Sequence, residues 1–241
     1  MFDVCRQCGS WNPEKRIDPA GPFAVCPECG FAHPFRQMPL LLLTGASGTG
    51  KTSVCCGLPF VMNEIVALES DLLWGLIPTD PDGGYGTYRN LWLRICKNVS
   101  QAGKPVLLCG SGVPDQYPFL AERRYFTRFH FLALTLRDDV LEKRLKTRPE
   151  WRRSDEAFLA DQLRFNRWFI DHGIVLHAKE AYQTGASCSD GKRRVIGKRS
   201  SVIPLPIEPM FLTLDTSEAP LDQTIAEVAR WIQAVLVSEN T

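Results

Sequence analysis

The chain has 241 residues, and 28 Lys and Arg against 27 Asp and Glu give it a formal net charge of +1. This balance gives no sign of a nucleic-acid-binding or membrane-binding surface, so any charged function must be local. The apolar runs stay short of the roughly 18 residues of a membrane span, and the start of the chain lacks the apolar core of a secretory signal. We therefore expect a cytoplasmic protein with one main domain and a small appendage, because a domain typically has about 100 to 200 residues.

Four of the nine cysteines lie near the start of the chain in two Cys-x-x-Cys pairs, Cys5 with Cys8 and Cys26 with Cys29. Two such pairs about 15 to 20 residues apart are typical of a four-thiolate zinc site, and disulfides are rare in a reducing compartment. A glycine after each pair permits a tight turn. We predict that residues 1–36 form a zinc ribbon, in which Zn²⁺ supplies folding free energy that so short a segment cannot gain by burial. A redox pair and disulfides are the alternatives.

Short apolar runs alternate with longer helical patterns over residues 40–241, which predicts an α/β domain with a parallel sheet. The predicted strands cover residues 40–44, 65–69, 105–109, 129–135 and 210–214. The predicted helices cover residues 51–60, 88–102, 138–146, 155–173 and 221–236. The helix that begins at Asp138 has an acidic first turn and one apolar face, as expected of a helix packed on a sheet.

The first predicted strand leads directly into a glycine-rich octet. Its residues are Gly45, Ala46, Ser47, Gly48, Thr49, Gly50, Lys51 and Thr52. The octet fits the pattern G-x-x-x-x-G-K-[ST] between a strand and a helix, where backbone N–H groups and the helix N-terminus bind phosphate. We expect Lys51 to reach the β- and γ-phosphates of a nucleoside triphosphate and the Thr52 hydroxyl to hold Mg²⁺.

Acidic residues follow the second predicted strand, at the sheet edge where ligands of α/β proteins bind. Glu69 and Asp71 are placed there to hold Mg²⁺ through water or to take a proton from an attacking hydroxyl group. The third predicted strand ends at Cys109, where many phosphate-loop ATPases carry a magnesium-positioning Asp. We expect Asp71 to be the base, with Glu69 and Asp115 as alternatives and a solvated or helix-capping acid as the plainer explanation.

Arginines cluster at the end of the helix after the fourth predicted strand. A planar guanidinium binds phosphate through two hydrogen bonds, which suits a closing lid. Pro149 ends the helix, so Arg148 and Arg152 can move with the loop that follows. A solvated basic helix end is the alternative.

Two further features are less specific. Tyr88 and Arg89 open the second predicted helix on the acceptor side of the sheet, and we predict that they bind substrate, although aromatic residues on helices more often belong to the core. Residues 182–209 are basic and rich in glycine and serine, which predicts a flexible insertion. Its charges could contact nucleic acid or phosphate, but solvated disorder is the commoner explanation.

Together these residues resemble the phosphate-loop nucleoside and nucleotide kinases of the adenylate-kinase, gluconate-kinase and shikimate-kinase type. The resemblance covers about residues 40–236. It rests on the octet, on Glu69-Ser70-Asp71, on Arg144-Leu145-x-x-Arg148 and on Leu214-Asp215-Thr216-Ser217. It implies a three-layer α/β/α fold with a five-stranded parallel sheet in the order 2-3-1-4-5, with ATP and Mg²⁺ as cofactors. It also implies that Thr216 and Ser217 pack against the adenine and that Arg148 and Arg152 cap the nucleotide.

We therefore expect an ATP-dependent kinase with a small-molecule acceptor, a nucleoside or a nucleotide, and with Lys51, Asp71, Arg148 and Arg152 as catalytic residues. The alternatives are a nucleotide-dependent binding or regulatory module and a polynucleotide 5′-hydroxyl kinase, whose ribbon would contact nucleic acid or protein. Acidic residues balance the basic residues of the ribbon, so it lacks a strong phosphate-binding footprint. The oligomeric state is left open.

Overall fold

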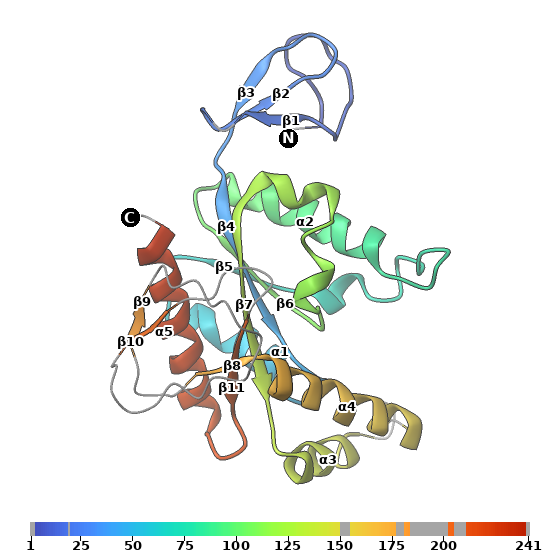
Figure 1. The fold of residues 1–241 in the computed structure, drawn as a ribbon, viewed down its shortest axis with the longest axis vertical. Helices are drawn as coiled ribbons and strands as arrows, with labels where there is room; N and C mark the ends of the chain where they lie inside the picture. Colours follow the sequence, from blue (N-terminus) through green and yellow to red (C-terminus); the bar gives the residue numbers. More distant parts are fainter. Residues whose placement is uncertain are drawn as a thin grey trace.

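A computed structural model describes residues 3–18, 20–149, 155–176, 181–183, 202–204 and 211–239. It contains a small N-terminal antiparallel sheet and a larger α/β unit, joined by residues 35–37 (Figure 1). Within these ranges, no helix has the length and apolar character needed to cross a membrane.

The large unit is built on a six-stranded, all-parallel sheet in the order β5-β6-β4-β7-β11-β8. Its strands are β4 (Met38–Thr44), β5 (Val66–Glu69), β6 (Val106–Cys109), β7 (Phe126–Thr135), β8 (Ile174–Val175) and β11 (Leu212–Asp215). The five predicted strands are all present, and their order 2-3-1-4-5 is confirmed. The prediction of five strands was too low by one, because the two residues of β8 are too few to show a strand pattern.

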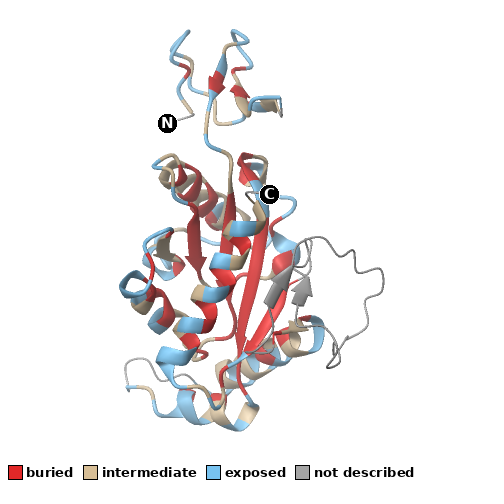
Figure 2. Ribbon diagram, turned by 90° about the vertical axis from the view of Figure 1, so that its left-hand side faces the viewer, coloured by how far each residue is buried: buried red, intermediate tan, exposed pale blue. Residues whose placement is uncertain are grey.

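Helices cover both faces of this sheet in three layers, and Figure 2 shows the strands buried between them. The helices are α1 (Lys51–Gly57), α2 (Gly86–Ser100), α3 (Asp138–Lys146), α4 (Glu156–His172) and α5 (Leu221–Glu239). Successive residues of a strand point to opposite faces. Leu41 and Leu43 of β4 therefore pack with α1 and α5, and Leu40 and Leu42 pack with α2 and α4. Both faces are buried, which explains the unbroken leucine run of β4.

Short 3₁₀ helices shape the loops at the sheet edges. They are η1 (Leu58–Phe60), η2 (Ser70–Leu73), η3 (Pro114–Gln116) and η4 (Ala121–Tyr125). The helix predicted over residues 51–60 is divided between α1 and η1, since Pro59 lacks the N–H that would continue the α-helical pattern. η2 carries Asp71 directly after β5, so this carboxylate lies at the carboxyl end of the sheet.

The N-terminal sheet contains β1 (Arg16–Asp18), β2 (Phe23–Val25) and β3 (Ala32–Pro34) in the order β1-β2-β3. The residues on either side of this sheet contact the α/β unit at the end of α2 and at η4. The Tyr125 hydroxyl donates a hydrogen bond to the Pro13 carbonyl at 2.8 Å, and the Arg36 backbone N–H donates to Gln101 Oε1 at 2.9 Å. These contacts hold the ribbon at the end of the α/β unit opposite α3, as Figure 1 shows.

A buried charge cluster joins the two units. Lys97 Nζ lies 2.7 Å from Glu122 Oε2 and 3.3 Å from Asp3 Oδ1, and both Lys97 and Glu122 are almost fully buried. The Lys97 ammonium also lies over the Tyr125 ring, 4.0 Å from its centroid. Buried charges are stable only when they are paired, so Asp3 of the ribbon completes an ion cluster of the α/β unit.

The segment that sequence analysis predicts to be a flexible basic insertion, residues 182–209, lies mostly outside the described residues. Two short strands in and beside it are described, β9 (Ala181–Gln183) and β10 (Val202–Pro204), and they pair in parallel.

Candidate active site

The glycine-rich octet forms the turn between β4 and α1. Gly45, Gly48 and Gly50 have φ values of +133°, +93° and +102°, which residues with a Cβ rarely adopt. A Cβ on Gly45 would also lie 2.4 Å from the Leu134 carbonyl oxygen. The glycines therefore allow the backbone to form a tight loop directly before the N-terminus of α1, where the N–H groups of the helix are free to bind an anion.

Lys51, at the start of α1, folds back over this loop. Its Nζ donates hydrogen bonds of 2.8 Å to the carbonyl oxygens of Gly45 and Ala46. Burial lowers the pKa of Lys51 from 10.5 to about 8, although the nearby charges of Asp71 and Glu69 favour the ammonium. A bound phosphate would add negative charge beside this ammonium and keep it protonated.

A cavity of about 210 Å³ lies over the loop and brings together most of the residues predicted to bind phosphate. Lys51, Thr52, Asp71 and Arg148 line it, and so does Glu69. The Thr52 hydroxyl donates a hydrogen bond to the Glu69 carboxylate. Arg148 Nη2 donates to Ser47 Oγ at 3.1 Å, which brings the end of α3 to the loop. The cavity therefore combines two cations with two carboxylates.

The other two predicted residues of this group have different places. Asp115 lies in η3 and lines a separate open hollow beside α4, so among the described acids Glu69 and Asp71 face the phosphate cavity. Arg152 lies outside the described residues. Cys109 lines the cavity where an Asp was expected, and its contact with Cys55, together with burial, raises the pKa of its thiol well above the usual value. A neutral thiol is a poor ligand for Mg²⁺, whereas the oxygens of Thr52, Glu69 and Asp71 are ligands that Mg²⁺ prefers.

A second cavity of about 230 Å³ lies on the other side of the loop, between α1 and α5. Thr216 lines it, together with Thr49, Gly50 and Arg144. Ser217 does not line it, since its hydroxyl donates to Asp215 Oδ1 at 2.6 Å and accepts from the Arg137 backbone N–H at 2.7 Å. Arg144 belongs to the motif at the end of α3, but sequence reasoning assigned it no role of its own.

A third cavity, of about 450 Å³, lies between α2 and α4 and adjoins the phosphate cavity. The two cavities share Ser47, Asp71, Gly110 and Ser111 as lining residues. Both predicted substrate residues, Tyr88 and Arg89, line this third cavity. Asp71 thus stands at the boundary between a phosphate cavity and an acceptor-sized pocket.

The Tyr88 hydroxyl is engaged with the protein itself. It donates to the Ser70 carbonyl at 2.5 Å, and Trp92 Nε1 donates to the same oxygen at 3.1 Å. These two bonds hold η2 in place and therefore position Asp71, the next residue. Tyr88 offers the pocket the surface of its ring, which is the part of the side chain left to contact a ligand.

Sequence reasoning missed Gln162 and Trp74. The Ser47 backbone N–H donates to Gln162 Oε1 at 2.7 Å, so α4 contacts the phosphate loop across 115 positions of the sequence. Trp74 follows η2 and lines the acceptor-sized pocket. No local pattern marks either residue, because each reaches the site through the packing of its element.

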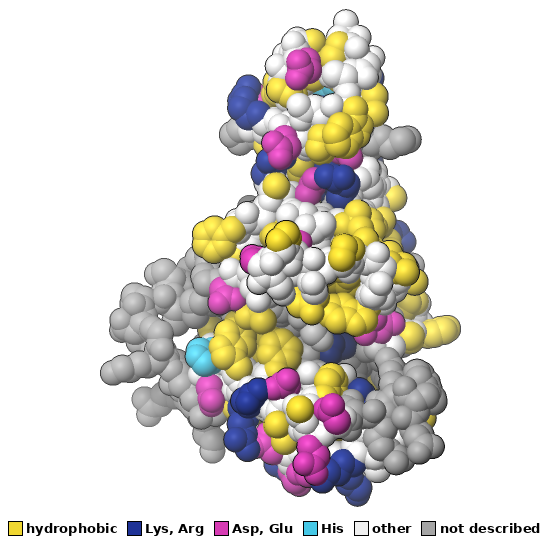
Figure 3. Space-filling view, turned by 90° about the vertical axis from the view of Figure 1, so that its right-hand side faces the viewer, with side chains coloured by type: hydrophobic (Ala, Val, Ile, Leu, Met, Phe, Trp, Pro, Cys, Tyr) yellow, Lys and Arg dark blue, Asp and Glu magenta, His cyan; other side chains and the backbone are white. Residues whose placement is uncertain are grey.

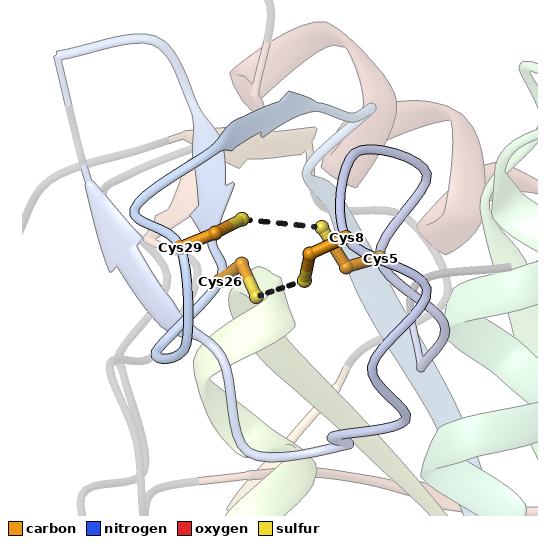
Figure 4. Close-up of side chains that lie close together, drawn as sticks. All are labelled: Cys5, Cys8, Cys26 and Cys29. Carbon is orange, nitrogen blue, oxygen red and sulfur yellow. Dashed lines mark hydrogen bonds between the residues drawn. The ribbon is translucent and has the colours of Figure 1, made fainter.

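The four predicted zinc ligands, Cys5, Cys8, Cys26 and Cys29, meet at one point of the ribbon (Figure 4), and their sulfur atoms all lie within 4.8 Å of one another. The Cys5 and Cys29 sulfurs are 3.6 Å apart, and those of Cys8 and Cys26 are 3.9 Å apart. A tetrahedral Zn²⁺ with Zn–S bonds of about 2.3 Å places its sulfurs roughly 3.8 Å apart. The four thiols therefore fit one zinc ion.

A hydrogen bond from Ser10 favours the metal-binding thiolate form of one cysteine, whereas burial and the contacts with the other cysteines raise the pKa of Cys29 to about 12. The Ser10 hydroxyl lies 3.6 Å from Cys26 Sγ, and this contact lowers the pKa of Cys26 from 9.0 to about 6. His33 Nε2 lies 3.3 Å from Cys5 Sγ, so this histidine contacts the cysteine cluster from outside it.

The parallel sheet and the glycine-rich loop define an α/β protein with a phosphate loop. A sugar kinase from Janibacter sp. HTCC2649 matches with a TM-score of 0.51 and 17% sequence identity over 83% of this chain and 96% of that chain. This similarity establishes the fold.

Two other solved structures match with lower TM-scores. A gluconokinase from Sinorhizobium meliloti 1021 matches with a TM-score of 0.45 and 18% identity over 85% of this chain and 97% of that chain. A shikimate kinase from Acinetobacter baumannii matches with a TM-score of 0.46 and 17% identity over 82% of this chain and 94% of that chain. No family model matches the sequence, and no curated protein matches it.

Proposed function

We propose that the protein is an ATP-dependent phosphotransferase that acts on a small-molecule acceptor. The observation that carries this proposal is the junction of two cavities at Asp71. On one side, Lys51 and Arg148 converge on the phosphate loop, and on the other side a pocket of about 450 Å³ is large enough for a small molecule. A carboxylate at this junction is placed to meet an acceptor hydroxyl as it approaches a γ-phosphate.

The residues of the phosphate cavity have separate roles in phosphoryl transfer. The acceptor oxygen forms a bond to the γ-phosphorus while the bond to the β,γ-bridging oxygen breaks and ADP leaves. Asp71 takes the proton of the acceptor hydroxyl. Lys51 and Arg148 stabilise the negative charge spread over the transferring group. Thr52 and Glu69 would hold Mg²⁺, which supplies further charge neutralisation when it is bound.

Two other groups of residues support this role from outside the reacting centre. Thr216 and Arg144 line the cavity beside α5 and would contact the nucleoside part of ATP. The four cysteines of the ribbon would hold one structural Zn²⁺, because four thiolates leave no open position for a reactant. The reducing cytoplasm that the sequence predicts would keep these thiols available for the metal.

The test incubates the protein with Mg-ATP and a panel of nucleosides, nucleotides and polyols, and measures ADP release and phosphorylated products. Lys51→Ala should nearly abolish transfer. Asp71→Asn should lower turnover by roughly 10²- to 10⁴-fold, with a much smaller effect on ATP affinity. Asp115→Asn is the matched control, since this carboxylate lies outside the phosphate cavity, and it should leave turnover unchanged.

Two results would overturn parts of this proposal. Full activity of Asp71→Asn would remove Asp71 as the base. Tight ATP binding without transfer to any acceptor would favour the nucleotide-dependent binding module instead. The polynucleotide-kinase alternative stays a prediction, because the basic cluster of the insertion 182–209 that motivated it lies outside the described residues.

A further inference from the structure

We propose that the phosphoryl acceptor is a molecule that combines a planar aromatic ring, an anionic group and a hydroxyl group, as a nucleotide does, and that the hydroxyl receives the phosphoryl group. The inference rests on the proposed phosphotransferase function and assigns a substrate class to the pocket between α2 and α4. Three features of this pocket carry it: its aromatic side chains, a cation that has no ion-paired acid among the described residues, and a carboxylate at the reacting end.

Aromatic side chains make up a third of the residues that line the pocket. The Trp74 and Tyr85 rings lie with centroids 5.3 Å apart and planes inclined by 31°, and the Tyr88 ring meets Trp74 edge-on at 5.8 Å. Phe158 and Phe165 of α4 line the same pocket. Figure 3 shows hydrophobic side chains gathered across the middle of this face of the molecule, above a lower end that carries many charged side chains. Aromatic side chains bind flat rings by stacking.

Arg89 supplies a positive charge to this pocket. In the described part of the chain, no Asp or Glu lies within ion-pair distance of the Arg89 guanidinium. The guanidinium lies 5.7 Å from the centroid of the Tyr85 ring. Asp80 lies close enough to Arg89 to interact with the guanidinium charge. The Asp80 carboxylate, however, accepts hydrogen bonds from the backbone N–H groups of Gly86 and Thr87 at the start of α2.

The neighbouring phenol does not balance the charge of Arg89 either. Tyr117 lines the same pocket and is hydrogen-bonded to Arg89, but burial raises its pKa to about 12, so its hydroxyl stays neutral at physiological pH. A guanidinium in a mainly apolar pocket is best matched by an anionic ligand group, because a charge-assisted hydrogen bond then replaces lost hydration. The pocket therefore suits an acceptor that brings its own negative charge.

The reacting end of the pocket favours a hydroxyl nucleophile over a phosphate nucleophile. Asp71 lines both cavities, and Glu69 lines the adjoining phosphate cavity. Two carboxylates repel a phosphate that would attack from this position, whereas Asp71 can accept the proton of a hydroxyl group. In the resulting step, the hydroxyl oxygen bonds to the γ-phosphorus, the β,γ-bridging P–O bond breaks, ADP leaves, and the proton passes to Asp71 and then to solvent.

Calorimetric titration of the zinc-loaded protein tests the ring and the anion. The probes are the four common ribonucleoside monophosphates, their uncharged nucleosides, and gluconate as a polyol. Each is titrated with and without Mg²⁺ and a non-hydrolysable ATP analogue, which fills the nucleotide site. At least one monophosphate should bind about tenfold more tightly than its nucleoside, because it alone carries a charge for Arg89.

Variants assign this preference to Arg89. Arg89→Gln should remove the preference for the monophosphate while leaving nucleoside affinity within about twofold, because stacking does not depend on the guanidinium charge. Arg128→Gln, an exposed arginine of β7 outside the pocket, is the control and should change neither affinity. An equal loss of both affinities in Arg89→Gln, binding of gluconate in place of every monophosphate, or no binding of any monophosphate would overturn the assignment.

Phosphorus NMR of the reaction with Mg-ATP tests the site of transfer and separates this inference from the proposed function. A new phosphomonoester on the nucleotide supports it, and a new phosphoanhydride overturns the hydroxyl assignment. Transfer to gluconate alone would leave the phosphotransferase standing and refute the acceptor class. Arg89-dependent nucleotide binding without any transfer would support the ring-and-anion assignment and refute the proposed phosphotransferase.

Discussion

The pKa of Lys51 makes the stability of the protein depend on pH in a way that one substitution can isolate. Burial lowers this pKa from 10.5 to about 8 in the folded protein. Between pH 8 and 10.5 the unfolded chain therefore binds more protons at Lys51 than the folded protein does, and the free energy of unfolding rises with pH. The Lys51→Met variant has no titratable group at this position. The free energy of unfolding of the wild type should therefore rise relative to that of the variant as the pH rises from 8 to 10.5.

The size of the gain follows from the pKa shift. A fall of roughly 2.5 pKa units corresponds to at most about 3 kcal/mol, since each unit is worth about 1.4 kcal/mol. Lys51 is only partly buried, so solvent screening reduces this value, and we expect a gain of about 1 to 3 kcal/mol between pH 7 and 10.5. Comparing pH values within each protein cancels the contacts that methionine loses at every pH.

Urea unfolding of the zinc-loaded, reduced protein at several pH values between 7 and 10.5 measures this difference. Lys104→Met is the control, because Lys104 is exposed and lies outside the phosphate cavity, and its stability should follow that of the wild type. If the difference in free energy of unfolding between the wild type and Lys51→Met stays constant with pH, the argument from burial is refuted. Saturating Mg-ATP should flatten the pH dependence, because bound phosphate holds Lys51 in its charged form.

Three further predictions test the ribbon, its junction with the α/β unit and the turn beside Asp71. Cys26→Ser should lower the zinc content measured by elemental analysis from one ion per chain to near zero, and limited proteolysis should then cut the ribbon first. Lys97→Met should lower the free energy of unfolding by about 3 to 5 kcal/mol, because Glu122 stays buried without its partner. Adding Glu122→Gln should recover most of that loss in urea unfolding. Gly110→Ala should cost about 1 to 3 kcal/mol in the same assay and also lower turnover, because its Cβ would lie 2.0 Å from Ser70 Oγ. Adding Ser70→Ala should restore part of the lost stability and part of the lost turnover.

Features that depend on neighbouring residues could be predicted from the sequence. The octet Gly45 to Thr52 specifies its own turn, since positive φ values and the strand-to-helix change are local properties. The two Cys-x-x-Cys pairs likewise each form one half of a cluster that the structure closes. The sheet order, by contrast, came from the resemblance to known kinases, because strand pairing joins segments far apart in the chain.

Features that depend on distant residues could not be predicted in this way. Arg144 and Thr216 are brought to one cavity by the packing of α3 and α5 around the loop. Ser217, which was predicted beside Thr216, turns instead toward Asp215 and Arg137. The sequence pattern gives the same prediction for Thr216 and Ser217. Only the path of the backbone after β11 places their side chains differently.

The sequence by itself determined where phosphate and metal chemistry would be concentrated, because a phosphate loop and a pair of cysteine turns are encoded within a few consecutive residues. Only the tertiary structure decided what surrounds that chemistry. Arg148 reaches Ser47 across 101 positions, and the aromatic pocket with Arg89 forms where α2 meets α4. The physical reason is that the side chains of a pocket converge through packing of the sheet and its helices, and no local pattern records which distant surfaces will meet.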